Sequence, residues 1–346
     1  MQAIPHSKPF MGTEEAQAAY DVVMSGMLAY GQKSRHLEQE WLELVGAENA
    51  AFVSSGFTAL RLALLSLGVK PKDEILVPAY TCTALHSSVM NIGAIPVLCD
   101  IKAGALTLDG MAAQKKITQR TKAAVIPHLF GERADIANLK SLLGGVPIIE
   151  DCAHAPYKTL GDLSISSFYP TKYIASAGSG IVAGSAELIE KVIDLRYYGD
   201  REPSPLRQND ISNDLSAAIV LEQLKKLQEI WIKRTNAANK YSRLILDSTV
   251  EEHIESPLPR PTNRYIYRYT IRLKNHLAAD ISDKMKAKKI CCEQPAWDYR
   301  NTIEWPNDLP NTDTAFDRVL SLPFYVGITE DEQRRVVETL GGVLNE

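Results

Sequence analysis

The chain has 346 residues, of which 45% are hydrophobic and 23% are charged, and its formal net charge is −4 at pH 7. This composition is typical of a folded globular protein and excludes a disordered chain. The slightly acidic balance, with no basic tract, gives no reason to expect a nucleic-acid partner, and the length allows two domains or one large domain with an appendage.

The cysteines form an odd set without paired C-x-x-C spacing, so neither a disulfide framework nor a zinc site fits them. The first residues, MQAIPHSKPF, lack the apolar core of a signal peptide, and no apolar run is long enough to span a membrane. We therefore predict a cytoplasmic protein without a membrane partner and without a metal site.

Apolar runs that predict strands alternate with helical patterns through the first two thirds of the chain. The predicted strands are residues 49–55, 74–80, 95–101, 122–130 and 146–151, and the first two predicted helices between them are residues 58–68 and 82–92. Continuous apolar strands separated by helices are typical of a mainly parallel sheet that helices cover on both faces. The sequence therefore predicts an α/β fold.

Polar and small residues follow several of these strands. In an open α/β sheet, ligands bind outside the carboxyl ends of the strands. The candidate site is therefore expected at the residues that fall there: Ser54, Ser55, Gly56, Asp100, His128 and Asp151.

A long apolar-faced pattern over residues 213–248 predicts a single helix, and Asp214 suits its first turn. After it, residues 254–273 are first punctuated by prolines and then alternate as in an antiparallel strand. We predict a large α/β domain over residues 1–235 and a smaller α+β domain over residues 236–346.

Two segments at the strand ends have both a structural and a functional interpretation. VSSGFTAL, residues 53–60, is a strand, a turn of small residues and a helix start, which is either an ordinary helix cap or a phosphate cradle that uses Ser55 and Thr58. IIEDCAHA, residues 148–155, places Asp151 directly after a buried strand. This carboxylate is either a satisfied structural acid or the counter-ion of a cationic ring nitrogen.

Two further residues are open in the same way. Lys172 lies in SSFYPTKYIASAGSGIVAG, a segment with no other charge; it is either a solvated loop residue or an amine that attacks an aldehyde or ketone. Asn209, just before the long helical pattern, is either a turn residue at the helix entry or part of a binding site. A phosphate cradle, an acid for a pyridinium and a reactive lysine are together the parts that hold pyridoxal 5′-phosphate (PLP).

With these motifs in this order, the chain resembles the fold-type I PLP-dependent enzymes, and within them the DegT/DnrJ/StrS sugar aminotransferases. The resemblance covers nearly the whole chain, and IIEDCAHA followed about twenty residues later by SSFYPTKYI is its most specific part. It implies a fold-type I PLP-dependent transferase, with PLP as the cofactor.

The resemblance also implies a role for each candidate residue. Lys172 would form the imine with the cofactor, Asp151 would keep the pyridine nitrogen protonated, and His154 would lie beside the cofactor. The phosphate would be bound by Ser55, Gly56, Phe57, Thr58 and Ser167. Asn209 would reach the phosphate of a partner subunit, which implies a homodimer with shared active sites.

The implied reaction moves an amino group from an amino acid donor, glutamate in many family members, to a keto sugar, with a nucleotide-linked sugar as the expected acceptor. The chain departs from the family pattern at Cys82, where an aromatic residue commonly stacks on the cofactor ring, so we expect Tyr80 or His154 to cover that face.

Two other functions stay open. The departures allow a non-catalytic or regulatory protein with this fold, and a different PLP reaction on a sugar, such as dehydration, although family dehydratases have a histidine in place of the lysine. A nicotinamide-binding protein has little support, because no G-x-G-x-x-G opens the first strand–helix unit.

Overall fold

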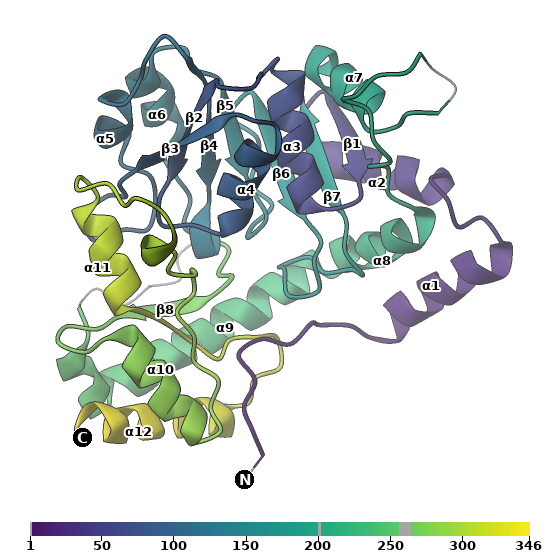
Figure 1. Cartoon of the computed structure of the whole chain (residues 1–346). Helices are drawn as coiled ribbons and strands as arrows, with labels where there is room; N and C mark the ends of the chain where they lie inside the picture. The colour runs from purple at the N-terminus through teal and green to yellow at the C-terminus, as the bar shows by residue number, and fades with distance from the viewer. Residues whose placement is uncertain (1, 200–201, 256–263) are drawn as a thin grey trace.

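The computed structural model of the chain describes residues 2–199, 202–255 and 264–346. A seven-stranded sheet in the order β1-β7-β6-β5-β4-β2-β3 forms the centre of its larger part (Figure 1). The strands are β1 (Asn49–Val53), β2 (Glu74–Pro78), β3 (Ile95–Cys99), β4 (Thr121–Pro127), β5 (Ile148–Asp151), β6 (Leu163–Ser167) and β7 (Gly180–Gly184).

The sheet is mainly parallel, which confirms the predicted fold class. β7 pairs antiparallel with both of its neighbours, β1 and β6, and all other neighbouring strands pair in parallel. β1 therefore runs in the same direction as β6 and β5. Because of this, the turn after β1 and the residues that follow β5 and β6 meet at one edge of the sheet.

Helices cover both faces of the sheet. In this part of the chain they are α1 (Thr13–Ser25), α2 (Gln32–Val45), α3 (Gly56–Ser66), α4 (Thr83–Asn91), α5 (Gly110–Gln114), α6 (Ile136–Leu143), α7 (Ala186–Leu195) and α8 (Asp214–Lys225), with a 3₁₀ turn at Leu129–Gly131. Alternate residues of β1 enter two different cores: Ala50 and Phe52 pack with α2 and α8, whereas Ala51 and Val53 pack with α3, α4 and α7. This is the period of two expected of a strand that is buried on both faces.

The run predicted as a buried strand over residues 95–101 is instead an edge strand, β3. Among the strands of the described residues it pairs with β2 alone, and Ile95 is 41% exposed. An edge strand has a neighbour on one side only, so its apolar residues are less covered than the sequence pattern suggested.

The prediction of one helix over residues 213–248 is wrong, because the chain forms two helices, α8 and α9 (Leu227–Leu246), with a break at Lys226. The backbone at Lys226 has φ −91° and ψ 1°, and its side chain pairs with Glu15 at 2.8 Å and Glu14 at 3.0 Å, both in α1. These ion pairs hold the break against α1. The break lets α8 stay on the sheet while α9 continues into a second core.

The second core contains the end of α9, a two-stranded antiparallel sheet of β8 (Tyr269–Arg272) and β9 (Val319–Leu322), and the helices around it. The helices of this region are α10 (Ala278–Ala287), α11 (Pro310–Arg318) and α12 (Glu330–Leu344), with 3₁₀ turns at Thr249–His253 and Arg300–Thr302. Ile4 packs into the same core and bridges to Ile290, so the start of the chain lies against its C-terminal part. The predicted domain division at residues 235 and 236 falls within α9 and stays a prediction, and the proline-punctuated residues 256–263 lie outside the described part.

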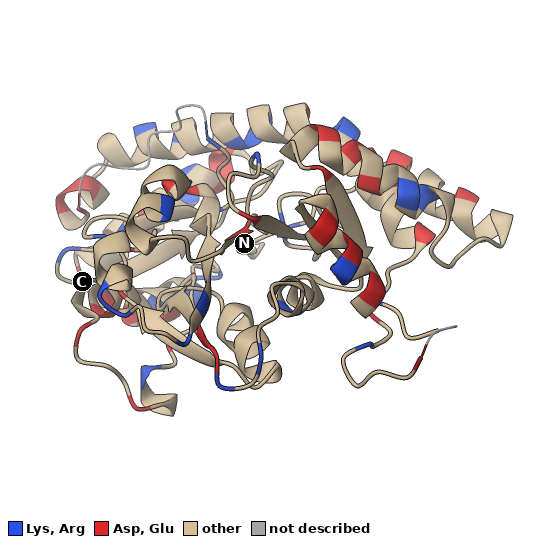
Figure 2. Ribbon diagram, turned by 90° about the horizontal axis from the view of Figure 1, so that it is seen from above, with Lys and Arg blue, Asp and Glu red and all other residues tan. Residues whose placement is uncertain are grey.

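Acidic and basic residues are interspersed along the ribbon (Figure 2). In the described ranges, no helix combines the length and the apolar character that crossing a membrane requires.

Candidate active site

Lys172 lies on the loop that joins β6 to β7. The loop is closed at its base, since the Phe168 N–H donates to the Ser179 carbonyl at 2.9 Å, and the Lys172 N–H donates to the Tyr169 carbonyl at 2.8 Å in a tight turn. The Lys172 side chain is half-buried. Because β6 ends at the same edge as β5, the turn brings the amine to the carboxyl ends of the parallel strands, where the sequence predicted a site.

Asp151 is the last residue of β5, and it is 8% exposed. Burial raises the pKa of its carboxyl, although the Ala153 N–H, which donates to Oδ1 at 2.9 Å, and the charge of Lys172 both act to lower it. Among the described residues, the Ala153 N–H is the one recorded hydrogen-bond donor to this carboxylate. A buried carboxylate with so few donors fits a protonated ring nitrogen as its partner.

His154 is held between two aromatic rings beside Lys172. Its ring is parallel to that of Tyr267, with centroids 4.2 Å apart at 13°, and also stacks with Phe130 at 5.7 Å. The Phe130 N–H donates to Nδ1 at 3.1 Å, which places the proton of a neutral imidazole on Nε2. Burial lowers the pKa of His154 well below its ordinary value, and the charges of Lys172 and Arg268 lower it further, so the ring is neutral at pH 7.

The turn between β1 and α3 is a capped helix start. The Ser55 side chain accepts the Thr58 N–H at 3.0 Å, and the Thr58 hydroxyl lies 2.9 Å from the Ser55 Oγ and 3.0 Å from the Ser54 Oγ. The sequence left open whether this segment is an ordinary cap or a phosphate cradle. The cap is present, and it leaves the N–H groups of Gly56 and Phe57 without partners inside the helix.

The backbone at this helix start is packed tightly against the ends of β6 and β7. A Cβ added at Gly56 would lie 2.6 Å from the Ser167 Cβ, and a Cβ added at Gly180 would lie 2.4 Å from the Ser55 carbonyl oxygen. The free N–H groups of α3 and the Ser167 hydroxyl are therefore neighbours. N–H groups at a helix start together with hydroxyls suit a phosphate, so the residues present fit the phosphate end of PLP.

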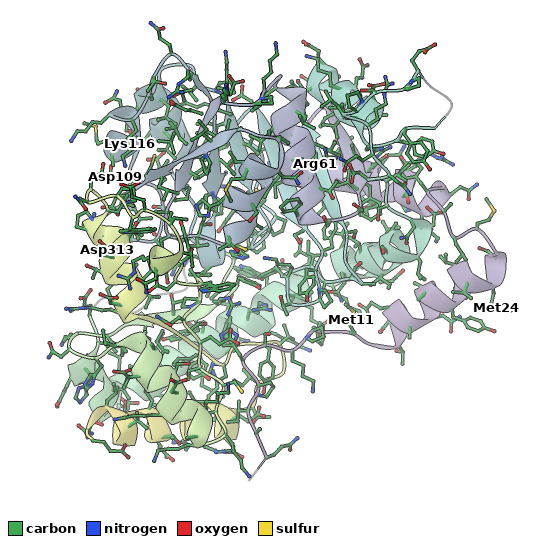
Figure 3. The ribbon with its side chains drawn as sticks, viewed as in Figure 1. Met11, Met24, Arg61, Asp109, Lys116 and Asp313 are labelled. Carbon is green, nitrogen blue, oxygen red and sulfur yellow. The ribbon has the colours of Figure 1, made fainter. Side chains whose placement is uncertain are left out.

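Asn209 is exposed, and the residue after it is anchored beside this cradle. The Asp210 carbonyl accepts the Ser54 N–H at 2.8 Å, and the Asp210 carboxylate forms a buried ion pair with Arg61. Arg61, labelled in Figure 3, belongs to α3, the helix whose first turn forms the cradle. Asn209 is therefore an exposed residue next to the cradle, and its contact with a partner subunit stays a prediction.

The two residues expected near the cofactor face lie in different surroundings. Tyr80 is 1% exposed, and its ring packs edge-on against Phe316 at 4.9 Å, inside the core. Cys82 is exposed directly before α4. That Tyr80 or His154 covers the cofactor face stays a prediction, as does a place for Cys82 at the cofactor, and the observed packing of Tyr80 is within the core.

Asp100 directly follows β3 and His128 directly follows β4, as predicted, but each side chain is bound within the fold. Asp100 accepts the Thr312 N–H at 2.8 Å and the Asn311 N–H at 3.1 Å, which caps the start of α11. His128 pairs with the buried Glu150 at 2.9 Å. These contacts give both side chains a structural role. Position at a strand end alone therefore does not show what a side chain will bind.

Sequence reasoning missed two residues of the site, Tyr267 and Phe130. The Lys172 Nζ lies 5.5 Å from the centroid of the Tyr267 ring. The alternating pattern around Tyr267 indicated a strand, but nothing in the sequence indicated that this segment returns to a loop nearly one hundred residues earlier. The sequence pattern predicts a strand that ends at Phe130, whereas β4 ends at Pro127 and Phe130 lies in the turn after it.

Comparisons with known proteins agree with this geometry. The profile of the DegT/DnrJ/EryC1/StrS aminotransferase family matches residues 9–341. The spore coat polysaccharide biosynthesis protein SpsC of Bacillus subtilis is 26% identical, over 99% of this chain and 97% of SpsC.

Solved structures resemble the fold over its whole length. DesV from S. venezuelae, solved with a ketimine intermediate, superposes with a TM-score of 0.87 at 26% identity, over the full length of both chains. Spr1654 from Streptococcus pneumoniae, described as a sugar aminotransferase and solved in its PMP form, has a TM-score of 0.90 at 22% identity, over 99% of this chain and 98% of its own. The chain belongs to the DegT/DnrJ/EryC1/StrS aminotransferase family, and it is a PLP-dependent aminotransferase of sugar biosynthesis.

Proposed function

We propose that this enzyme transfers an amino group from an amino acid, with glutamate as the donor, to a nucleotide-linked keto sugar. The observation that carries the proposal is the arrangement of Lys172 and the buried Asp151 at the same sheet edge as the α3 cradle. The name of SpsC supports a place in polysaccharide biosynthesis.

Two groups of residues would bind PLP, one at its phosphate and one at its ring nitrogen. The N–H groups of Gly56 and Phe57, with the Ser55, Thr58 and Ser167 hydroxyls, would bind the phosphate. Asp151 would bind the protonated ring nitrogen. When bound there, PLP supplies an electron-withdrawing ring that stabilises negative charge on a substrate carbon.

Lys172 and His154 supply the proton chemistry. The Lys172 ε-amine takes the proton from the α-carbon of the donor and returns a proton during the transfer, a role that contributes about 10²–10⁴-fold to such rates. His154, neutral and with Nε2 as its N–H, is a hydrogen-bond donor beside the amine. With the protonated ring nitrogen as its partner, the Asp151 carboxylate would be ionised and would keep that positive charge at the far end of the site.

A spectroscopic experiment tests the role of Lys172. The wild-type protein with PLP is expected to show a visible absorption band that disappears when glutamate converts the cofactor to pyridoxamine phosphate. Lys172→Ala is expected to lack both the band and the conversion, whereas Lys158→Ala, which changes an exposed lysine, keeps them. A wild-type protein that binds PLP but is not converted by any amino acid would support the non-catalytic alternative instead.

The acceptor is identified by offering keto sugars, free and nucleotide-linked, to the pyridoxamine phosphate form. Return of the visible band together with an amino-sugar product is expected with a nucleotide-linked keto sugar. Formation of a dehydrated sugar would favour the alternative PLP reaction.

We also propose that the enzyme is a homodimer with shared active sites. Helix α1 lies at the rim of the molecule, and Met11 and Met24 near its two ends are exposed (Figure 3). Met24 and Met27 are 66% and 69% exposed, Tyr20, Val23 and Leu28 are exposed near them in sequence, and Met11 is exposed just before the other end of α1. A cluster of exposed apolar side chains of this kind is typical of a surface that another subunit covers.

Mixing two inactive variants tests the shared sites. Lys172→Ala and Asn209→Ala are each expected to be impaired, and a mixture that exchanges subunits is expected to regain activity, since one site of the mixed dimer then has both native residues. A mixture that forms mixed dimers but gains no activity would show that Asn209 serves its own subunit.

The five free cysteines are consistent with a reducing cytoplasm as the compartment.

A further inference from the structure

Tyr267 is fixed in place by its backbone as well as by its ring. Its N–H donates to the Phe130 carbonyl at 3.0 Å, and its own carbonyl accepts from Nη1 of the buried Arg234 at 3.0 Å. The ring is stacked on His154 at 4.2 Å, and the residue is 5% exposed. The position of the ring is thus determined from three sides.

Phe130, whose carbonyl accepts the Tyr267 N–H, lies in a strained turn. Phe130 has φ 55°, a left-handed conformation that is uncommon for a residue other than glycine. Its N–H donates to His154 and its carbonyl accepts from Tyr267, so one residue in this conformation ties the two stacked rings together. At Gly131 an added Cβ would lie 2.0 Å from the Tyr265 carbonyl oxygen, so the two segments meet where only a glycine fits. Strain of this kind persists where the surroundings fix it, and it is concentrated at functional sites.

Tyr267 contacts the lysine loop through the face of its ring. The Lys172 Nζ lies over its ring, 5.5 Å from the centroid, which is within the range of a cation–π interaction. The charged and titratable groups around this ring are Lys172, Arg268, Arg234 and His154.

We propose that Tyr267 is a positioning residue for Lys172, and that the face of its ring holds the ε-ammonium group whenever the lysine is not bound to the cofactor. This inference rests on the proposed role of Lys172 as the lysine that reacts with PLP. A free lysine side chain has four rotatable bonds, and restricting it keeps the amine close to the atoms with which it must exchange protons. The ring, rather than the hydroxyl, is the operative group.

A spectroscopic test needs no turnover. The lysine amines of the full-length protein, freed of cofactor, are reductively methylated with ¹³C, and the Lys172 signal is assigned by its loss in Lys172→Ala. Methyl groups above an aromatic ring resonate upfield, so the Lys172 methyls are expected upfield of the exposed lysines in the wild type and in Tyr267→Phe. In Tyr267→Leu they are expected to move to the position of the exposed lysines.

The wild-type spectrum decides the matter even where Tyr267→Leu does not fold, because Lys172 methyls at the position of the exposed lysines would overturn the proposal. An unchanged upfield signal in a folded Tyr267→Leu would also overturn it. If the proposed function fails, no amino group is transferred to any keto sugar, but this spectrum can still be measured. Failure of the proposed function can therefore be distinguished from failure of the positioning role.

A kinetic test separates positioning from structure. Tyr267→Leu is expected to slow the single-turnover conversion by glutamate about 2- to 30-fold, the range of one cation–π interaction, without weakening PLP binding. Tyr267→Phe is expected to keep the wild-type rate. Tyr265→Leu is the matched control, since Tyr265 packs on Tyr157 and Tyr173 instead of the lysine. Equal slowing by the Tyr265 and Tyr267 leucine variants would show a structural effect and refute the positioning role.

Discussion

Replacing Gly56 by alanine tests the cradle at the start of α3. The new Cβ would lie 2.6 Å from the Ser167 Cβ and 2.9 Å from its Oγ, closer than side-chain carbons approach in folded proteins. Overpacking of this kind costs about 1–3 kcal/mol. If the chain does not relax, the free energy of unfolding falls by that amount; if α3 moves away from Ser167, the cradle widens and the affinity for PLP falls by about 5- to 150-fold.

Both quantities are measured on the same variant, by urea unfolding without cofactor and by fluorescence titration with PLP. Gly342→Ala is the control, because a Cβ at this position in α12 meets no atom of the described residues within 4 Å. It is expected to leave the protein as stable as the wild type or more stable by about 0.5–1 kcal/mol. A Gly56→Ala protein with both wild-type stability and wild-type PLP affinity would refute the close packing of α3 against Ser167.

Two further predictions concern buried charges. Asp151→Asn is expected to lower the rate of amino transfer about 10²–10³-fold. It is also expected to stabilise the cofactor-free protein at pH 7. Burial raises the folded-state pKa of this carboxyl above the ordinary value of 3.8, so the wild type loses stability as pH rises through the folded pKa. The thermal unfolding temperatures of the two proteins should therefore converge below pH 4. Arg61→Ala is expected to cost about 3–5 kcal/mol in urea unfolding, because it leaves the Asp210 carboxylate buried without its partner. Lys191→Ala, which breaks an exposed pair, is expected to cost less than about 1 kcal/mol, and similar losses for the two variants would contradict the reasoning.

The fold class could be predicted from the sequence because the strands are short apolar runs with small polar residues after them. The same signal placed Ser55, Gly56 and Asp151 at one edge of the sheet. It could not separate residues that bind a ligand from residues that cap a helix or pair inside the fold, as Asp100 and His128 do. That distinction depends on what the rest of the chain brings to each side chain.

The remaining differences arise from tertiary contacts. No proline or glycine near Lys226 predicts the helix break there, and the break is held by ion pairs to α1, which is distant in sequence. Tyr267 reaches the lysine loop through the turn at Phe130, whose left-handed backbone leaves no signature in the sequence. The aromatic half of the candidate site was therefore beyond local pattern reading.

Helix α9 belongs to both halves of the molecule, since Ile230 packs under the large sheet whereas Tyr241 and Ile245 pack in the C-terminal core. Ile4, from the opposite end of the chain, also packs in the C-terminal core. Neither half can therefore be cut out with its hydrophobic interior intact. A fragment that begins after α9 would lose one wall of its core, and a truncation of the first few residues would remove another. The two halves are accordingly expected to melt together in one cooperative transition, and a protein shortened at its N-terminus is expected to lose stability in both.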